Sequence, residues 1–440
     1  MKRSKGFIFL VVVMALTLIM VACGGQASVQ STASSSTGAQ SAESSLEKEP
    51  VTIVVEHIVD DGPALKEIKK LFEVEYPYIT VELVEIPNAE FREKITVQLS
   101  AGEDIDIFWG GNHGEYADSI SMGQCYPLDE LIKRDNLDIT NYHSNYDSMK
   151  CGGSVYALPN RCDAAVLFYN KELFDQAGVE YPQGNMSYEA FRELAKKMSW
   201  GEGDSKVWGA FVHKWPICWE RPAIQAGATT IDSDLSLFKD ALQMRLDMEA
   251  DGSIMKYPDQ IAISAHYRTM FEKGNVAMVI MGDYLVGQLR AEEAEGNMDF
   301  DWDIVACPIP EGCEPNTTTG MPSGFCMNAN TKKVDAAWEF MKFAAGPEGA
   351  KCYAQSGYMP GWVDEDVRSI MAYDGKTKPA NIGILLDQKV YEEYPAVAGI
   401  SQVEAIYKEE AELTFAGEQT VDETMENIAR RISELGLNKD

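Results

Sequence analysis

Two spacings of hydrophobic residues alternate along residues 51–109. Short apolar runs rich in β-branched residues predict buried strands, and apolar residues that recur every three or four positions predict helices between them. We expect strands at 51–55, 79–84 and 104–109. Between the first two strands we expect a helix that begins at Pro63 and ends at Pro77. A second helix contains Phe91, Ile95 and Leu99 on one face and ends at Gly102. This alternation predicts a parallel sheet with right-handed crossovers. A ligand of such a sheet lies beyond the carboxyl ends of its strands, here near 56–62 and 109–114.

The same two spacings continue through the rest of the chain. Ser187 is a favourable N-cap residue, and helical spacing begins soon after it. We expect extended segments at 156–159, 166–170, 276–281 and 303–306. We expect helices at 171–178, 189–198, 234–251, 258–273 and 421–437, and one more helix that begins after Lys332. These elements predict an α/β protein with two lobes and a helical C-terminal region.

The N-terminal segment has the form of an export signal. Lys2, Arg3 and Lys5 precede an apolar run at 7–21, which is short for a membrane-spanning helix of roughly 20 residues. Ala22-Cys23 resembles a bacterial lipobox, in which the cysteine is acylated and becomes the mature N-terminus. The alternative is an ordinary cleavable signal with a chance cysteine. We therefore expect a signal peptide at 1–22, lipidation at Cys23 and a disordered Ser-rich tether at 23–49.

Charge and length narrow the function classes. The 440 residues predict two or three domains. The chain has 38 Lys and Arg against 69 Asp and Glu, a net charge of -31. This excludes a basic nucleic-acid footprint and a polybasic membrane surface. Eight cysteines remain besides Cys23, and none forms a C-x-x-C pair, which argues against zinc-ribbon or thioredoxin chemistry. A disulfide between Cys307 and Cys313 could close the loop between them. The alternative is that these cysteines, like the others, are small buried hydrophobic residues.

Six segments of the chain share the order and spacing of a known family, namely 156–163, 167–178, 271–284, 308–324, 335–343 and 357–360. They resemble the extracellular solute-binding proteins of ABC importers, in the carbohydrate-binding group that includes maltose-binding protein. The resemblance implies a two-lobed periplasmic-binding-protein-like α/β fold with hinge crossings and a ligand cleft. By that resemblance, lobe one is 51–160 plus 306–345, and lobe two is 161–305 plus 346–440.

Candidate ligand-binding residues gather near the expected strand ends and crossings. A sugar stacks its C–H face on aromatic rings and pairs its hydroxyls with carboxylate, amide and guanidinium groups. The candidates are Asp61, Trp109, Asn112, Arg161, Asp163, Trp215, Trp219, Asp283, Tyr284, Ser323, Gly324 and Trp362. We expect no metal, because His57, Asp60 and Asp61 have no further ligand at a diagnostic spacing, and we expect no cofactor.

Each candidate also has a structural explanation. Trp109 can belong to the core, and Arg161 with Asp163 can be a hinge ion pair. Trp215 and Trp219 can share one buried helix face, although Pro216 argues against a regular helix there. Asp283 can cap a helix that begins at Tyr284.

The leading hypothesis is a substrate-binding lipoprotein of an ABC transporter. It captures an extracellular sugar or oligosaccharide between its lobes and delivers it to the membrane permease, without catalysis. Such a protein is a monomer, lipid-anchored on the extracellular face of the cell membrane, with no nucleic-acid partner. The rival hypotheses are a secreted glycosidase, which needs two carboxylates flanking a glycosidic bond, and a ligand-sensing lipoprotein.

Overall fold

The computed structural model describes residues 49–372 and 374–437. The expected signal peptide, Cys23 and residues 24–48 of the expected tether lie outside the described residues. The strands are β1 Val51–Ile58, β2 Ile79–Ile86, β3 Ile107–Trp109, β4 Lys150–Cys151, β5 Ser154–Val155, β6 Ala157–Asn170, β7 Met278–Gly282, β8 Trp302–Val305, β9 Thr317–Met327 and β10 Lys389–Glu392. The α-helices are α1 Gly62–Glu75, α2 Asn88–Ala101, α3 His113–Ser121, α4 Asp129–Arg134, α5 Ser144–Ser148, α6 Lys171–Ala177, α7 Tyr188–Lys197, α8 Ile217–Gln225, α9 Ser236–Ala250, α10 Tyr257–Ala262, α11 Tyr267–Glu272, α12 Tyr284–Glu295, α13 Val334–Ala345, α14 Pro347–Gln355, α15 Glu365–Ile370, α16 Ile400–Phe415 and α17 Val421–Leu435.

One sheet runs through the described residues. Eight strands form it, in the order β2-β1-β3-β9-β6-β7, with β10 beside β9 and β8 beside β6. β1 pairs in parallel with β2 and β3, so the parallel sheet predicted for residues 51–109 is confirmed. β9 lies antiparallel to both β3 and β6. The carboxyl ends of β1, β2 and β3 therefore share one edge of the sheet, where ligands of parallel sheets bind.

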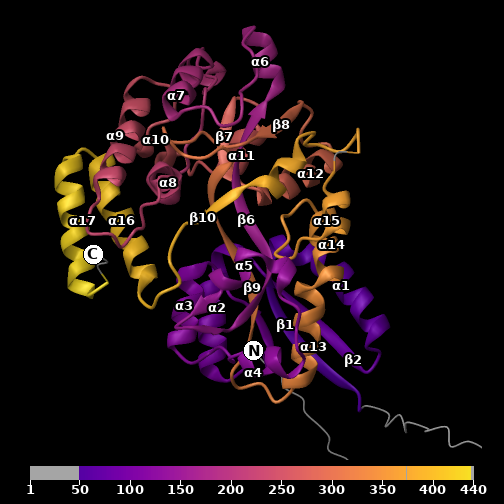
Figure 1. The fold of residues 1–440 in the computed structure, drawn as a ribbon. Coiled ribbons are helices and arrows are strands. Elements are labelled where there is room, and N and C mark those ends of the chain that lie inside the picture. The colour runs from indigo at the N-terminus through magenta and orange to yellow at the C-terminus, as the bar shows by residue number, and fades with distance from the viewer. Residues whose placement is uncertain (1–48, 373, 438–440) are drawn as a thin grey trace, which may run out of the picture. The chain divides into compact units, whose positions relative to one another are not determined.

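β6 connects two groups of elements. Its first half, from Ala157 to Ala164, pairs with β9, and its second half pairs with β7 and β8. In Figure 1, β6 runs from the group around β1–β3 to the group around β7 and β8. We call these the β1–β3 group and the β7–β8 group. This arrangement agrees with the predicted two-lobed α/β fold class, whereas the lobe boundaries given above stay a prediction.

The helical pattern read from the sequence describes the core well. Leu65, Ile68 and Phe72 of α1 are fully buried, as their shared face predicts. Gly102 ends α2 in the left-handed conformation at φ 73°. The expected helical C-terminal region consists of α16 and α17, whose Tyr407 and Ile428 pack in one apolar cluster with residues of α8 and α9.

Two local expectations are wrong. The expected helix at 258–273 is two helices, α10 and α11, separated by Ser264 at φ 51°. The segment after Pro216 is a helix, α8, although Pro216 made a regular helix unexpected there. The expected extended segments 156–159 and 166–170 both fall in one strand, β6, which has a register shift between Pro159 and Arg161.

Cysteine pairing and membrane insertion were also open questions. All eight cysteines of the described residues are free, so no bridge joins Cys307 and Cys313. Five of the eight are buried, which agrees with their alternative role as small hydrophobes.

Among the described residues, no helix combines the length and the apolar character that crossing a bilayer requires.

Candidate functional site

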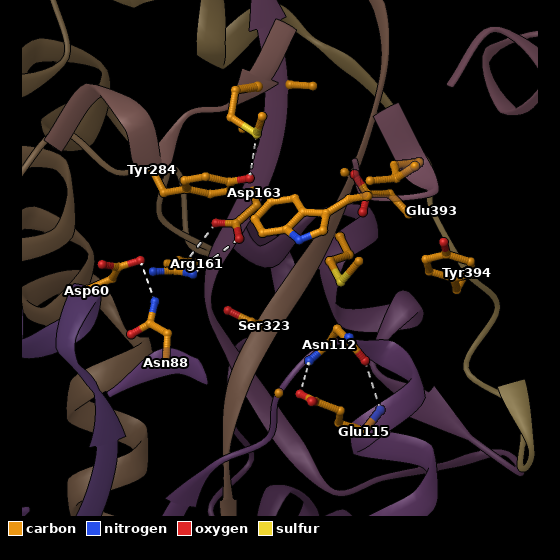
Figure 2. Close-up of a pocket in the computed structure, with 18 of the residues that line it drawn as sticks. Asp60, Asn88, Asn112, Glu115, Arg161, Asp163, Tyr284, Ser323, Glu393 and Tyr394 are labelled. Carbon is orange, nitrogen blue, oxygen red and sulfur yellow. Dashed lines mark hydrogen bonds and ion pairs between the residues drawn. The ribbon is translucent and has the colours of Figure 1, made fainter. Parts of the chain in front are cut away.

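A cavity of about 370 Å³ is lined by residues of both the β1–β3 group and the β7–β8 group. Its size lies within the usual range of small-molecule sites. Figure 2 shows Asp60 on one side of this pocket and Glu393 on the other, with Asp163 between them. The cavity therefore adjoins the carboxyl end of β1, where the sheet topology places ligands.

The structure brings seven of the predicted ligand-binding residues together at this cavity. They lie at or beyond the end of β3, on β6 and β9, ahead of α8, and at the start of α12. The seven are Trp109, Asn112, Arg161, Asp163, Trp215, Tyr284 and Ser323. Their contact with a ligand stays a prediction.

Asn112 is positioned by the helix that it caps. Its Oδ1 accepts a hydrogen bond from the backbone N–H of Glu115 at 2.9 Å, and the Glu115 carboxylate accepts one from the Asn112 N–H. This capping box begins α3 directly after β3 and fixes both side chains at the cavity wall. Because Asn112 Oδ1 is engaged in the cap, its amide N–H groups remain to bind a ligand.

Arg161 is held by two carboxylates. Its Nη1 lies 3.1 Å from Asp61 Oδ1, and its Nε lies 3.0 Å from Asp163 Oδ1. Burial raises the pKa of Asp61 to about 6, although the Arg161 charge acts against this shift. The pKa of Asp163 is also raised, chiefly by burial and against the attraction of Arg161. Arg161 and Asp163 are thus an ion pair, as one alternative expected, and both also line the cavity.

Asp61 and Asp283 do not line the cavity. Both are fully buried, and Asp61 lies behind Arg161 as its partner. Asp283 accepts hydrogen bonds from the backbone N–H groups of Ala164 and Met359, at 3.1 and 2.6 Å. Its side chain does not cap α12. Asp283 instead joins β6 to the turn that contains Met359, and burial raises its pKa to about 8.

Trp219, Trp362 and Gly324 do not line the cavity either. Trp219 is 2% exposed, and its ring lies 6.1 Å from that of Tyr407 in the apolar core. The Trp362 ring packs edge-on against Tyr142 at 5.1 Å. Gly324 lies in the sheet, where an added Cβ would come within 2.4 Å of a β6 carbonyl oxygen. The two rings and this glycine therefore serve packing rather than the cavity.

Sequence reasoning missed several cavity residues. The charged ones are Asp60, Arg92, Glu115, Arg221, Glu393 and Glu404, and others are Asn88, Tyr267 and Tyr394. Asn88 donates a hydrogen bond to Asp60 at 2.9 Å, which joins the start of α2 to the segment after β1. Asp60 followed a predicted strand end and could have been found by that signal. Glu393 follows the four-residue β10, which no periodic pattern announces.

The cavity offers both polar atoms and ring faces. Among the described residues, Ser323 Oγ and Trp109 Nε1 are buried without a hydrogen-bond partner. Trp215 is 39% exposed, and its ring lies 5.4 Å from that of Tyr267. Such a wall suits a solute with hydroxyl groups and an apolar face. The described residues contain no group of three or more His, Cys, Asp or Glu that could hold a metal ion.

Residues 57–351 match the family model described as bacterial extracellular solute-binding protein, which covers more than half of the chain. The chain belongs to this family. The arabinooligosaccharide-binding protein of Bacillus subtilis is 23% identical over 315 residues, which are 67% of this chain and 69% of that protein.

Solved structures share the fold. A sugar transporter of Rhizobium etli in an open conformation has a TM-score of 0.75 at 27% identity, over 87% of this chain and 99% of its own. An ABC substrate-binding protein of Listeria monocytogenes in complex with cycloalternan has a TM-score of 0.78 at 22% identity, over 89% and 100%. The resemblance and the fold class predicted from the sequence are thereby confirmed, and these similar proteins are binding proteins or transport components rather than enzymes.

Proposed function

We propose that the protein is the substrate-binding lipoprotein of an ABC importer. It captures an extracellular sugar or oligosaccharide in the cavity and delivers it to the membrane permease. The observation that carries this proposal is that one cavity is lined by the exposed Trp215 ring and by the unpartnered Ser323 Oγ and Trp109 Nε1. The names of similar proteins support it, since they bind arabinooligosaccharide, lactose and cycloalternan.

Location and assembly belong to the same proposal. The lipobox-like Ala22-Cys23 supports acylation of Cys23 and a lipid anchor on the extracellular face of the cell membrane. Metabolic labelling with a fatty acid tests this directly. The same proposal takes the protein to be a monomer.

The binding test is calorimetry over a sugar panel with the purified protein. Trp215→Ala should weaken binding of the sugar that binds best by about 1–3 kcal/mol, the share of one stacking ring. Trp200→Ala is the matched control, because Trp200 is a partly buried ring outside the cavity. Equal affinity in the wild-type protein and the Trp215→Ala variant would contradict the proposed cavity.

Two rival functions remain to be separated by experiment. A glycosidase would convert a bound oligosaccharide, whereas a binding protein should return it intact to a chromatography column after many hours. A ligand-sensing lipoprotein would bind as tightly but would not support uptake. Loss of sugar uptake in a strain without this protein, restored by its return, therefore supports transport over sensing.

A further inference from the structure

The cavity wall carries an excess of negative charge. Among the residues that the structure describes, five carboxylates line it, against three guanidinium groups. The carboxylates are Asp60, Glu115, Asp163, Glu393 and Glu404, and the guanidinium groups are Arg92, Arg161 and Arg221. A neutral sugar does not need this imbalance, because its hydroxyl groups can also pair with amide and guanidinium groups.

The three arginines are engaged by the protein. Arg161 is ion-paired with Asp61 and Asp163. Arg92 donates to Ser119 Oγ at 3.1 Å and to the Glu115 carbonyl at 3.0 Å, and pairs with Asp118. Arg221 is 3% exposed and donates to Thr319 Oγ1 at 2.7 Å. Each arginine therefore already contacts the protein before a ligand arrives.

Four of the five carboxylates have no ion pair among the described residues, Asp163 being the exception. Figure 2 shows Glu393 on the side of the cavity opposite Asp60, and Glu404 also lines the cavity. Burial raises the pKa of Glu393 to about 7, with Arg221 opposing and Asp163 and Glu404 reinforcing the shift. Burial likewise raises the pKa of Glu404, which Glu115 reinforces. Both side chains are half-buried, and Lys408 opposes the shift at Glu404 as Arg221 does at Glu393. Half-buried carboxylates that form no ion pair still carry a desolvation cost, which a cationic ligand would offset.

A second observation points to a ligand at this wall. Ser323 is 3% exposed and lines the cavity, yet its Oγ has no partner among the described residues. Figure 2 shows Ser323 on the same side of Arg161 as Asn112, facing the pocket. The rings of Trp215, Tyr267 and Tyr284 also line the cavity, and aromatic faces attract cations. A metal ion is a poorer fit, because the described residues bring no suitable cluster of ligands together.

We infer that the preferred ligand is a carbohydrate with a protonated amino group, an amino sugar, whose ammonium binds at Glu393 and Glu404 while its hydroxyls and ring face meet Ser323 and Trp215. This inference rests on the proposed function and specifies its substrate class. Acetylation of the amine would remove the charge and leave the carboxylates without a partner. The site should therefore discriminate against N-acetyl sugars as well as against neutral ones.

The experiment compares matched sugars by calorimetry on the purified protein. The probes are glucose, glucosamine and N-acetylglucosamine, with the corresponding galactose and mannose series. At roughly pH 6.5, an amine with a pKa near that of an α-amino group is protonated. In at least one series the amino sugar should bind about tenfold or more tightly than both partners, the value of a charged hydrogen bond.

Substitution of a cavity carboxylate tests whether that carboxylate causes the preference for amino sugars. Glu393→Gln keeps the shape and removes the charge, and it should abolish most of the amino-sugar preference while affinity for the neutral sugar changes less. Glu392→Gln is the matched control, since Glu392 is its exposed neighbour in the chain and does not line the cavity. Melting curves without ligand should show both variants folded.

The outcomes are distinguishable. Neutral sugars that bind as tightly as amino sugars, or tighter, would overturn this inference and leave the proposed function standing. An amino-sugar preference that persists in both Glu393→Gln and Glu404→Gln would also overturn it. If no sugar of any series binds, the proposed function fails, and this inference fails with it.

Discussion

At the scale of single residues, Glu220 of α8 shows how burial controls a charge. Glu220 is fully buried, and burial raises its pKa well above the ordinary 4.5 even though the Tyr394 hydroxyl donates to its Oε2 at 3.0 Å. A raised folded-state pKa means that the native state binds the proton more tightly than the unfolded state. The contribution of protonated Glu220 to the free energy of unfolding is therefore fully present below pH 4.5 and is lost as the pH rises through the folded pKa.

Glu220→Gln removes the ionisable proton and keeps an acceptor for Tyr394. The variant should raise the free energy of unfolding by about 1–3 kcal/mol near pH 8, and this gain should vanish toward pH 4. Urea unfolding at several pH values measures it. Glu202→Gln, at an exposed position, should change nothing at either pH. An equal effect of Glu220→Gln at both pH values would contradict the burial of a protonated carboxyl.

The sequence could predict a cavity residue when that residue directly follows or lies on a recognisable strand. Asn112 follows β3, and Arg161 and Asp163 lie on β6. It could not predict whether a tryptophan is packed or exposed, because Trp219 meets Tyr407, which is distant in the chain. The same limit applies to Glu393, whose place at the cavity depends on β10 joining the edge of β9.

At the scale of elements, β6 and β9 carry the connection between the two groups. Gly320 of β9 faces Ala164 of β6, and an added Cβ would come within 1.8 Å of the Asp163 carbonyl oxygen. Gly320→Ala should therefore force the strands apart and lower the free energy of unfolding by about 2–4 kcal/mol. Gly383→Ala is the control, because nothing lies within 4 Å of the corresponding Cβ. Equal chemical denaturation midpoints for the two variants would contradict this prediction.

Helices with a clear apolar face, such as α1 and α17, could be predicted because their burial follows from local spacing. The continuity of β6 could not, since Pro159 interrupts the pattern and a register shift after it restores the pairing. The break between α10 and α11 could not be predicted either, because helical spacing of apolar residues continues through Ser264. The left-handed backbone of Ser264 separates the two helices in the structure.

At the scale of the whole molecule, the cavity draws its lining from both groups of elements. Trp109 and Asn112 belong to the β1–β3 group, and Tyr267 and Tyr284 to the β7–β8 group. A ligand that contacts both sides prefers the conformation in which they are close. Hinge motion through β6 and β9 would bring the two sides of the cavity together.

Small-angle scattering tests this motion on the soluble form without its lipid anchor. A sugar shown by calorimetry to bind should lower the radius of gyration, because contacts on both walls are gained only when the groups approach. The Trp215→Ala variant, at the same sugar concentration, should show a smaller decrease, since its lower affinity leaves more of the protein unliganded. At saturating sugar the variant should approach the compact value of the wild-type protein. A bound sugar that leaves the radius of gyration unchanged would show that binding uses a cavity of fixed width, and the hinge through β6 and β9 would then have no part in capture.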